Sequence, residues 1–302
     1  MTKALISHVA QHIDYKINHR LDEIKKRIIE STTPCEANNQ IELLESLTEF
    51  ELGQFLIQHE GLNGHWTHEL VTWNKNNPKR VLKNNLEHAL FEQIPATLAT
   101  RQRFTIFQKH LLPLITPNKV VASIPSGYMS ELLLLENKAL KNIQMIGIDL
   151  DSNALDGATE LAMQCDLKSN LTLIQADAWE LSHQEAFDVI TSNGLNIYEH
   201  DDDRVVQLYK IFYQALKANG TLITSFLTPP PTISPMSPWN MKNIDLESLQ
   251  LQKLIFVDIL KVKWSAYRTV DTTKQQLTSA GFKNIEIVYD DAGMFPTVIA
   301  HK

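Results

Sequence analysis

The chain has 302 residues, of which 43% are hydrophobic and 21% are charged, a composition typical of soluble globular proteins. This length accommodates two domains, or one domain with a large appendage. The formal net charge of −7 disfavours a nucleic-acid substrate, since phosphate recognition needs a basic surface. No apolar run approaches the ~20 residues of a membrane span, and residues 1–20 lack the apolar core of a signal peptide.

The two cysteines, Cys35 and Cys165, have no spacing typical of metal ligands. A disulfide framework or a thiolate metal site is therefore not expected. We expect the protein to be cytoplasmic.

The first third of the chain, residues 1–112, predicts helices only. Apolar residues from Leu5 to Ile28 recur every three or four positions, as on one face of a helix. A second helix is expected over residues 41–56. Breaks typical of loops occur at residues 31–34, 61–64, 76–78 and 95.

From Lys119 onward, short β-branched runs alternate with helical patterns. Strands are expected at residues 120–124, 144–149, 171–175, 188–192 and 221–226. A helical stripe from Val205 to Leu216 is expected to close on Asn219 and Gly220 as its C-terminal cap. The alternation predicts a doubly wound parallel sheet. Two last strands, at 285–289 and 297–301, are joined by seven residues, too few for a parallel crossover, so they should pair antiparallel.

The run from Met145 to Asp149 is apolar and ends on a carboxylate. In open α/β sheets the ligand lies beyond the carboxyl ends of the strands, where an acidic residue binds a ribose diol. The alternative role, capping the next helix, suits Asp151 and Ser152 better. We therefore expect Asp149 to bind ribose and to have no structural partner.

Ordered markers extend this pattern along the chain. Gly127 follows the first strand and Asp149 the second; further markers are Gln175 to Ala178, Phe187 to Gly194, Leu216 to Leu222 and Gly281–Phe282. With the C-terminal hairpin, residues 117–302 resemble a class I S-adenosylmethionine-dependent methyltransferase. The resemblance implies a Rossmann-like α/β fold with a doubly wound seven-stranded sheet, a reversed last strand and S-adenosylmethionine as cofactor.

The resemblance also implies a division of the chain. Residues 1–112 form an all-α N-terminal cap that covers the substrate, and residues 113–302 form the cofactor-binding domain. Within the latter, residues 228–270 are the expected specificity insertion, since loops at the ligand side of a sheet commonly carry specificity.

The first loop departs from the family, which has an acidic residue and two or three glycines there. Ser123 stands at the acidic position, and only Gly127 survives of the glycines. The hydroxyl of Ser123 can still accept a hydrogen bond. The cofactor-binding residues implied by the resemblance are Ser123, Ile124, Pro125, Gly127, Asp149, Leu150, Asp177, Ala178, Trp179, Asn193, Gly194, Leu195 and Arg103.

Candidate catalytic and substrate residues lie in the loops. Tyr198 and His200 follow the fourth strand, where the methyl group should point, and His200 is a candidate general base. The candidate substrate residues are Trp66, Tyr198, Trp239, Tyr267 and Arg268, of which Arg268 could clamp a carboxylate or phosphate. Structural alternatives stay open: the tryptophans could be core residues, and Arg268 could be an arginine exposed to solvent.

The loop after the fourth strand excludes some reactions. Residues 193–196 lack the Asn/Asp-Pro-Pro-aromatic motif of nucleobase amine methyltransferases, and Thr228 to Pro231 offer no metal ligands. We therefore predict methyl transfer to an O, N or C nucleophile of a small molecule without a metal. The alternative is a non-catalytic cofactor-binding or scaffold protein of the same fold, which the altered first loop favours. The exposed face of the first helix could pair with that of a second copy, so a homodimer stays a possibility.

Overall fold

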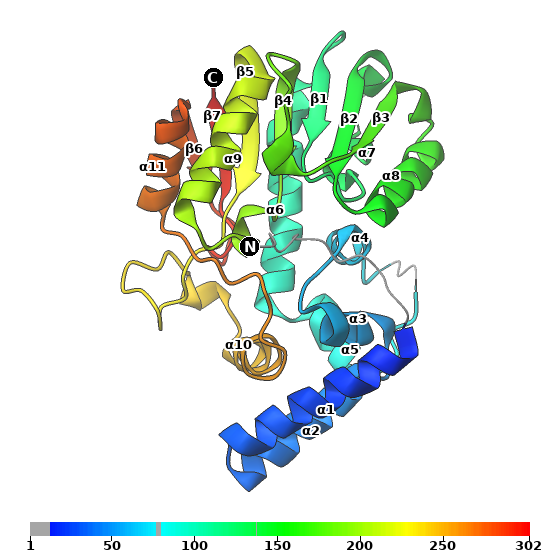
Figure 1. Ribbon diagram of the computed structural model, residues 1–302, viewed down its shortest axis with the longest axis vertical. Coiled ribbons are helices and arrows are strands. Elements are labelled where there is room, and N and C mark those ends of the chain that lie inside the picture. The colour runs from blue at the N-terminus through cyan, green and yellow to red at the C-terminus, as the bar shows by residue number, and fades with distance from the viewer. Residues whose placement is uncertain (1–12, 77–79, 137) are drawn as a thin grey trace. The chain divides into compact units, whose positions relative to one another are not determined.

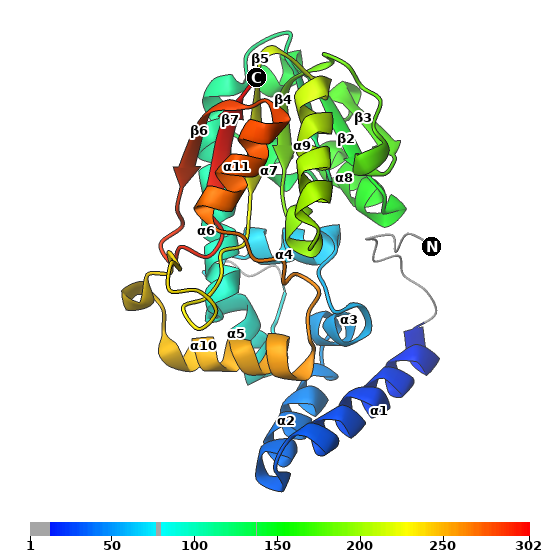
Figure 2. The same ribbon diagram turned by 60° about the vertical axis from the view of Figure 1, so that its left-hand side comes forward.

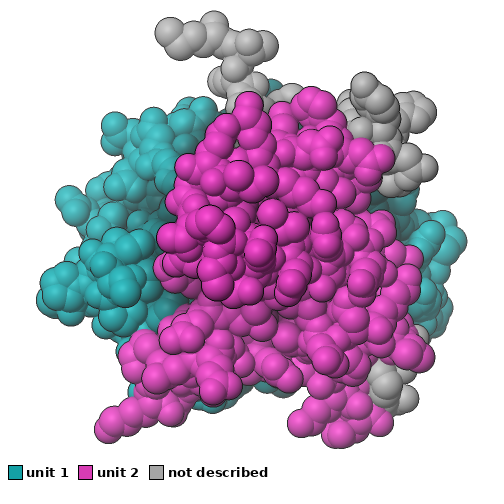
Figure 3. All heavy atoms as spheres, turned by 90° about the horizontal axis from the view of Figure 1, so that it is seen from below, with its two compact units in different colours: residues 1–7, 99–240, 265–302 teal, residues 8–98, 241–264 magenta. Residues whose placement is uncertain are grey.

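The computed structural model describes residues 13–76, 80–136 and 138–302. The chain divides into two compact units, coloured separately in Figure 3. Among the described residues, unit 1 comprises 99–240 and 265–302, and unit 2 comprises the described part of 13–98 together with 241–264. The functional division at residue 112 stays a prediction.

Unit 1 contains one seven-stranded sheet with the order β3-β2-β1-β4-β5-β7-β6. Its strands are β1 (Val120–Ser123), β2 (Gln144–Asp149), β3 (Leu171–Gln175), β4 (Phe187–Ser192), β5 (Leu216–Ser225), β6 (Lys283–Val288) and β7 (Thr297–His301). The first five strands are parallel, and β7 pairs antiparallel with both β5 and β6. The predicted fold class, including the reversed C-terminal hairpin, is confirmed.

Helices cover both faces of this sheet, as Figures 1 and 2 show. On one face lie α9 (Asp202–Ala215) and α11 (Val270–Ala280); on the other lie α6 (Pro95–Leu111), α7 (Ser130–Leu133) and α8 (Ser152–Gln164). Successive strand residues alternate between the two cores. Ala122 and Ile190 pack with α9, whereas Val121 and Val189 pack with the opposite layer, as the period of two in a strand requires.

Short turns complete the chain. The 3-10 turns are η1 (Leu112–Leu114), η2 (Lys138–Asn142), η3 (Lys168–Asn170), η4 (Ala178–Glu180), η5 (Asn196–Tyr198) and η6 (Met241–Asn243), and η7 (Leu254–Ile259) is a π-helical turn. At the start of η4, the side chain of Asp177 accepts a capping hydrogen bond from the backbone N–H of Trp179.

The predicted cap at Asn219 and Gly220 is wrong. Helix α9 ends at Ala215, and Leu216 already pairs with Phe187 of β4. Leu216 is fully buried, so its packing favours strand pairing over another helical turn. The register then shifts before Val189 pairs with Thr221, and Asn219 takes a positive φ of 63° within this irregularity.

Unit 2 is helical and has its own core. Its helices are α1 (Ile13–Ser31), α2 (Pro34–Leu47), α3 (Glu51–His59), α4 (Gly64–Thr72), α5 (Asn85–Glu92) and α10 (Leu246–Lys253). The single helix expected over residues 41–56 is two helices, α2 and α3. Gly53 of α3 lies close to the end of α2: a Cβ at this position would lie 2.0 Å from the carbonyl oxygen of Leu47. The approach of the two helices therefore requires glycine.

Parts of the sequence-based prediction lie outside the described residues, namely Leu5 and Val9 of the first helical stripe and Asn77 and Pro78 of the third break. Among the helices that the structure describes, none is long and apolar enough to cross a membrane.

Candidate active site

The loop after β1 is held by backbone hydrogen bonds from both neighbouring strands. The N–H of Ile124 donates to Thr191 O (2.8 Å), and the N–H of Ser126 donates to Ile148 O (2.9 Å). The Ile124–Pro125 peptide is cis, and Gly127 has a φ of +49°, a conformation that glycine adopts without strain. The loop thus runs along the carboxyl ends of β1, β2 and β4, where the sequence places the cofactor.

Asp149 ends β2 and contacts this loop. Its Oδ2 accepts from the N–H of Gly127 (2.8 Å), and its Oδ1 accepts from the N–H of Asp151 (2.9 Å). Burial raises the pKa of Asp149, and these backbone donors oppose that rise. The expectation that Asp149 has no structural partner is wrong. Each carboxylate oxygen can accept more than one hydrogen bond, so both oxygens can still accept from a ribose hydroxyl.

The expected helix cap is also observed beside it. Asp151 precedes α8, and its side chain accepts from the backbone N–H of Asn153 (3.0 Å). Asp149 therefore does not serve as the cap of α8, and its oxygens lie between the first loop and the start of that helix.

A carboxylate that sequence reasoning missed lies at the ends of β1 and β4. Oε1 of Glu131 accepts hydrogen bonds from the hydroxyls of Ser123 (2.7 Å) and Thr191 (2.8 Å). Desolvation raises the pKa of Glu131, against the two hydroxyl donors. Ser123 stands at the position where the resemblance implies an acidic residue. Glu131, from the following helix α7, places a carboxylate beside it. No sequence spacing signals it, because Glu131 lies eight positions after Ser123 across a loop of irregular backbone.

The tip of β3 carries Asp177, Ala178 and Trp179. One oxygen of Asp177 accepts from the N–H of Trp179 (2.9 Å) and forms an Asx turn, a common local role of aspartate in loops. The second oxygen makes no hydrogen bond to the described part of the chain. The indole N–H of Trp179 donates to Arg204 O (2.9 Å), and the Arg204 guanidinium lies 5.1 Å from the ring centroid. Trp179 is thereby anchored on α9. Near them, Leu150 accepts from Gln175 through its carbonyl oxygen (3.1 Å).

The loop after β4 begins with Asn193, Gly194 and Leu195. Gly194 has a φ of +84°, and a Cβ built there meets nothing within 4 Å. Its backbone therefore borders open space at the carboxyl edge of the sheet. Asn193 Oδ1 accepts from the hydroxyl of Ser225 (3.0 Å), which ties the loop to the end of β5.

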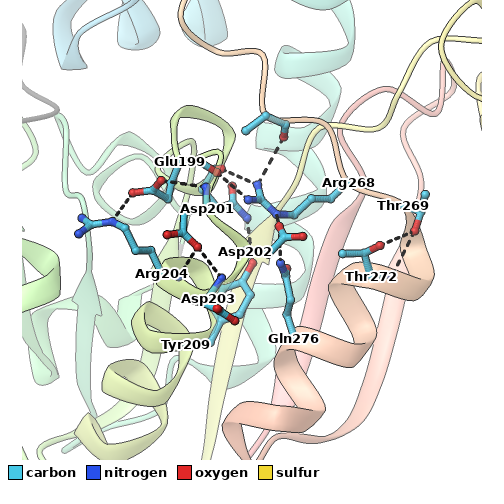
Figure 4. A network of polar contacts seen from close by, with 12 residues as sticks. Glu199, Asp201, Asp202, Asp203, Arg204, Tyr209, Arg268, Thr269, Thr272 and Gln276 are labelled. Carbon is cyan, nitrogen blue, oxygen red and sulfur yellow. Dashed lines mark hydrogen bonds and ion pairs between the residues drawn. The ribbon is translucent and has the colours of Figure 1, made fainter. Parts of the chain in front are cut away.

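Arg268 holds the next part of this loop, as Figure 4 shows. It is 5% exposed, pairs with Asp202 (2.9 Å) and donates to the carbonyl oxygens of Asn196 (2.8 Å) and Glu199 (2.6 Å). Gln276 of α11 donates to the same oxygen of Asp202 (2.9 Å). The guanidinium is thus used by the protein, and the structure gives Arg268 a structural role in place of the predicted substrate clamp.

The two predicted catalytic residues lie on the segment that Arg268 holds. Tyr198 is half-buried in η5, and its phenol is close enough to Arg103 to influence that guanidinium. His200 is exposed, with Nε2 3.4 Å from the hydroxyl of Ser265. Asp201 caps α9 by accepting from the backbone N–H groups of Asp203 and Arg204, and acidic residues at a helix N-terminus are stabilised by the helix dipole. The catalytic roles of Tyr198 and His200 stay predictions.

Arg103 lies on α6 beside the ends of β5 and β7. It is 4% exposed; its Nη1 is 3.4 Å from the hydroxyl of Ser225, and its guanidinium lies 4.9 Å from the Phe295 ring centroid. Its predicted contact with the cofactor stays a prediction.

The other predicted substrate residues differ in accessibility. Trp66 is 4% exposed within the core of unit 2, so the structure makes it a packing residue and it is not proposed as a substrate contact. Trp239 is half-buried and donates from its indole to Thr228 (2.9 Å). Tyr267 is half-buried beside Leu227, and burial raises its pKa. Within the described residues, no cluster of three His, Cys, Asp or Glu side chains could hold a metal ion.

Comparison with known proteins agrees with this geometry. A family model described as a methyltransferase domain matches residues 126–264. The chain is 46% identical to a crystallised protein of Bordetella parapertussis, described as a possible exported protein, over 97% of both chains with a TM-score of 0.91. The chain contains a class I S-adenosylmethionine-dependent methyltransferase domain.

More distant methyltransferases share the fold alone. The magnesium protoporphyrin IX methyltransferase of Synechocystis, with bound S-adenosylhomocysteine (SAH), has a TM-score of 0.52 at 12% identity, over 79% of this chain and 94% of that one. An S-adenosylmethionine-dependent methyltransferase in its apo form has a TM-score of 0.50 at 12% identity, over 88% of this chain and 75% of that one. No curated protein matches the sequence.

The family's cofactor is S-adenosylmethionine, and the methyltransferase residues described above fit it. Asp149 ends β2 with spare acceptor capacity for a diol. Gly194 presents backbone to open space. Glu131 is a desolvated carboxylate that a positively charged ligand would favour in its ionised form.

Proposed function

We propose that this methyltransferase transfers a methyl group from S-adenosylmethionine to an O, N or C nucleophile of a small molecule. The observation that carries the proposal is the contact between Asp149 and Gly127 (2.8 Å), which joins the ribose-binding carboxylate to the first loop. Ser123, Ile124, Pro125, Leu150, Asp177, Ala178, Trp179, Asn193, Gly194 and Leu195 complete the proposed cofactor site.

Glu131 supplies the negative charge that this loop otherwise lacks. The methionine end of the cofactor carries an ammonium group, and its sulfonium is also positive. A carboxylate at the ends of β1 and β4 stabilises such charges when water is displaced. Glu131 therefore takes the role that the resemblance assigns to an acidic residue at position 123, which is to stabilise the positive charge of the cofactor.

The reaction is an in-line displacement. The bound cofactor supplies a methyl group already activated on a sulfonium. The nucleophile's electron pair forms the new bond to the methyl carbon, the carbon–sulfur bond breaks with its electron pair left on sulfur, and the nucleophile's proton passes to a base or to water. The protein's contribution is mainly to orient the acceptor and exclude water. Tyr198 is proposed to orient the acceptor and His200 to receive the proton.

Several features support a small acceptor. The net charge of −7 argues against nucleic acid. Trp239 and Tyr267 lie in residues 228–270, the proposed specificity insertion, and both keep some exposed surface. Residues 1–112 are proposed to cover the acceptor. Hydrogen exchange measured with and without SAH tests this, and we expect SAH to increase the protection of these residues.

Compartment and oligomeric state belong to the same proposal. We infer a cytoplasmic protein, because Cys35 and Cys165 are free thiols and disulfides are rare in that compartment. Cell fractionation tests this, and recovery outside the cell would contradict it. Sedimentation tests the homodimer that the first helix leaves open.

A transfer assay tests the function. The protein is incubated with methyl-labelled S-adenosylmethionine and a metabolite extract, with Asp149→Ala as the control for contaminating enzymes. We expect label in small molecules for the parent and much less for the variant. Binding of the cofactor without transfer to any extract fraction would favour the non-catalytic alternative, and absence of binding would contradict both.

A further inference from the structure

The guanidinium of Arg103 is a buried cation without an ion-pair partner among the described residues. It is 4% exposed, and its one hydrogen bond to a described residue is the long contact of Nη1 with Ser225 (3.4 Å). Its buried Nε and its Nη2 make no hydrogen bond within the described chain. A buried charge normally has both an ionic partner and satisfied donors, and the described residues supply Arg103 with neither.

The nearest acidic side chain does not fill this role. Asp290 is 3% exposed and accepts from the backbone N–H groups of Ala292 (3.1 Å), Met294 (3.1 Å) and Phe295 (2.7 Å). Its carboxylate shapes the loop between β6 and β7 and acts on Arg103 only from a distance. The aromatic face of Phe295 offers the guanidinium a weak further attraction.

Arg103 nevertheless stays charged. Burial lowers its pKa to about 10, while electrostatic interactions with Asp290 and Tyr198 oppose that fall. A group with this pKa is protonated at neutral pH. Arginine also binds carboxylate and phosphate through paired donors.

The position of Arg103 indicates which ligand carries the anion. Its neighbours are Ser225 at the end of β5, Phe295 before β7 and Tyr198 after β4. The proposed ribose and adenine contacts, Asp149 and Asp177, end β2 and β3 on the other half of the sheet. The half that holds Arg103 is the half to which the methyl group should point.

We propose that Arg103, instead of contacting the cofactor as the family resemblance implies, binds a carboxylate or phosphate group of the methyl acceptor beside Ser225 and Tyr198. This inference rests on the proposed function and deepens it, since it names the acceptor as an acidic small molecule. The hydroxyl of Ser225 accepts from Arg103 and donates to Asn193, and it thereby holds the guanidinium beside the loop after β4.

Calorimetry with defined anions tests this proposal. SAH is titrated first into the parent, Arg103→Met and Lys109→Met, where Lys109 is an exposed residue of the same helix and controls for the charge change. Benzoate, succinate and phosphate are then titrated into each SAH-saturated protein. Arg103→Lys keeps the charge and replaces Arg103→Met if the latter does not fold.

We expect SAH to bind all these proteins within a few-fold, and at least one anion to bind the parent and Lys109→Met about tenfold more tightly than Arg103→Met. A large loss of SAH affinity in Arg103→Met would place the cofactor's own carboxylate at Arg103 and overturn the proposal. Equal anion binding in parent and Arg103→Met, or none in either, would also overturn it. Failure of SAH to bind the parent would instead contradict the proposed function.

Discussion

The carboxylate of Asp149 accepts a hydrogen bond from the backbone N–H of Gly127 across 2.8 Å. This contact fixes the first loop against the tip of β2. It gives Asp149 two tasks, because the oxygens that shape the apo loop are the oxygens proposed to bind ribose. A substitution at Asp149 therefore changes both stability and cofactor binding.

Replacing Asp149 with Ala should weaken SAH binding at least about tenfold, since charge-assisted hydrogen bonds to the ribose are lost. It should also lower the free energy of unfolding by about 1–3 kcal/mol, because the N–H groups of Gly127 and Asp151 lose their acceptor. Calorimetry and denaturant unfolding measure the two effects. Undiminished SAH affinity in a folded variant would refute the placement of the cofactor.

Replacing Glu131 with Gln should weaken cofactor binding without lowering apo stability. The pKa of Glu131 is raised by burial, so its contribution to stability is present at low pH and is lost as pH rises through the folded-state pKa. Gln is neutral at every pH, and its carbonyl oxygen can still accept from Ser123 and Thr191. Thermal unfolding should therefore show the variant at least as stable as the parent at neutral pH.

We also expect Glu131→Gln to change how the affinity for S-adenosylmethionine depends on pH. Binding of the positively charged cofactor favours ionised Glu131, so the parent's affinity for S-adenosylmethionine should rise with pH through the pKa of Glu131. Titrations across that range should give a flatter profile for Glu131→Gln. As a matched rescue, Ser123→Asp combined with Glu131→Gln should recover affinity, whereas Ser123→Asp alone should destabilise the protein by placing two carboxylates together. Identical profiles for parent and Glu131→Gln would exclude the proposed role.

Replacing Gly194 with Ala should cost about 1–2 kcal/mol of stability, because an L-residue is strained at its φ of +84°. The added methyl group should also enter the open space beside the backbone and reduce SAH affinity several-fold. Asn219→Ala is the control, because Asn219 has a positive φ of 63° but lies near the opposite end of β5. If both variants bind SAH equally well, Gly194 does not border the cofactor.

Replacing Arg268 with Met should destabilise the protein by about 2–4 kcal/mol, since Asp202 and the carbonyl oxygens of Asn196 and Glu199 lose a buried donor. Lys141→Met provides the contrast. It removes an exposed ion pair with Asp166 and should leave the denaturant midpoint close to that of the parent. Denaturant unfolding compares them, and similar midpoints would contradict the structural role of Arg268.

Much of the fold could be predicted because it depends on local patterns. Residues from Met145 to Asp149 read as a buried strand from their hydrophobicity alone, and the seven-residue connection after Tyr289 dictates an antiparallel hairpin. The split between α2 and α3 could not be predicted in this way. It depends on the close approach of Gly53 to Leu47, which is a packing relationship.

The site was predictable where position on a strand determines the role, as for Asp149. It was not predictable where a side chain reaches across the fold. Glu131 meets Thr191 over 60 positions of sequence, and Arg268 meets Asp202 over 66. Residues this far apart in the sequence have no fixed geometry. The sequence alone therefore identifies neither the buried carboxylate of Glu131 nor the structural contacts of Arg268.

The carboxyl ends of β1, β2 and β4 are proposed to bind S-adenosylmethionine. This placement of the cofactor can be tested by calorimetric titration of the parent protein with S-adenosylmethionine and SAH. We expect saturable binding of both at one site per chain, with competition between them. No detectable heat with either ligand, in a protein that unfolds cooperatively, would contradict it.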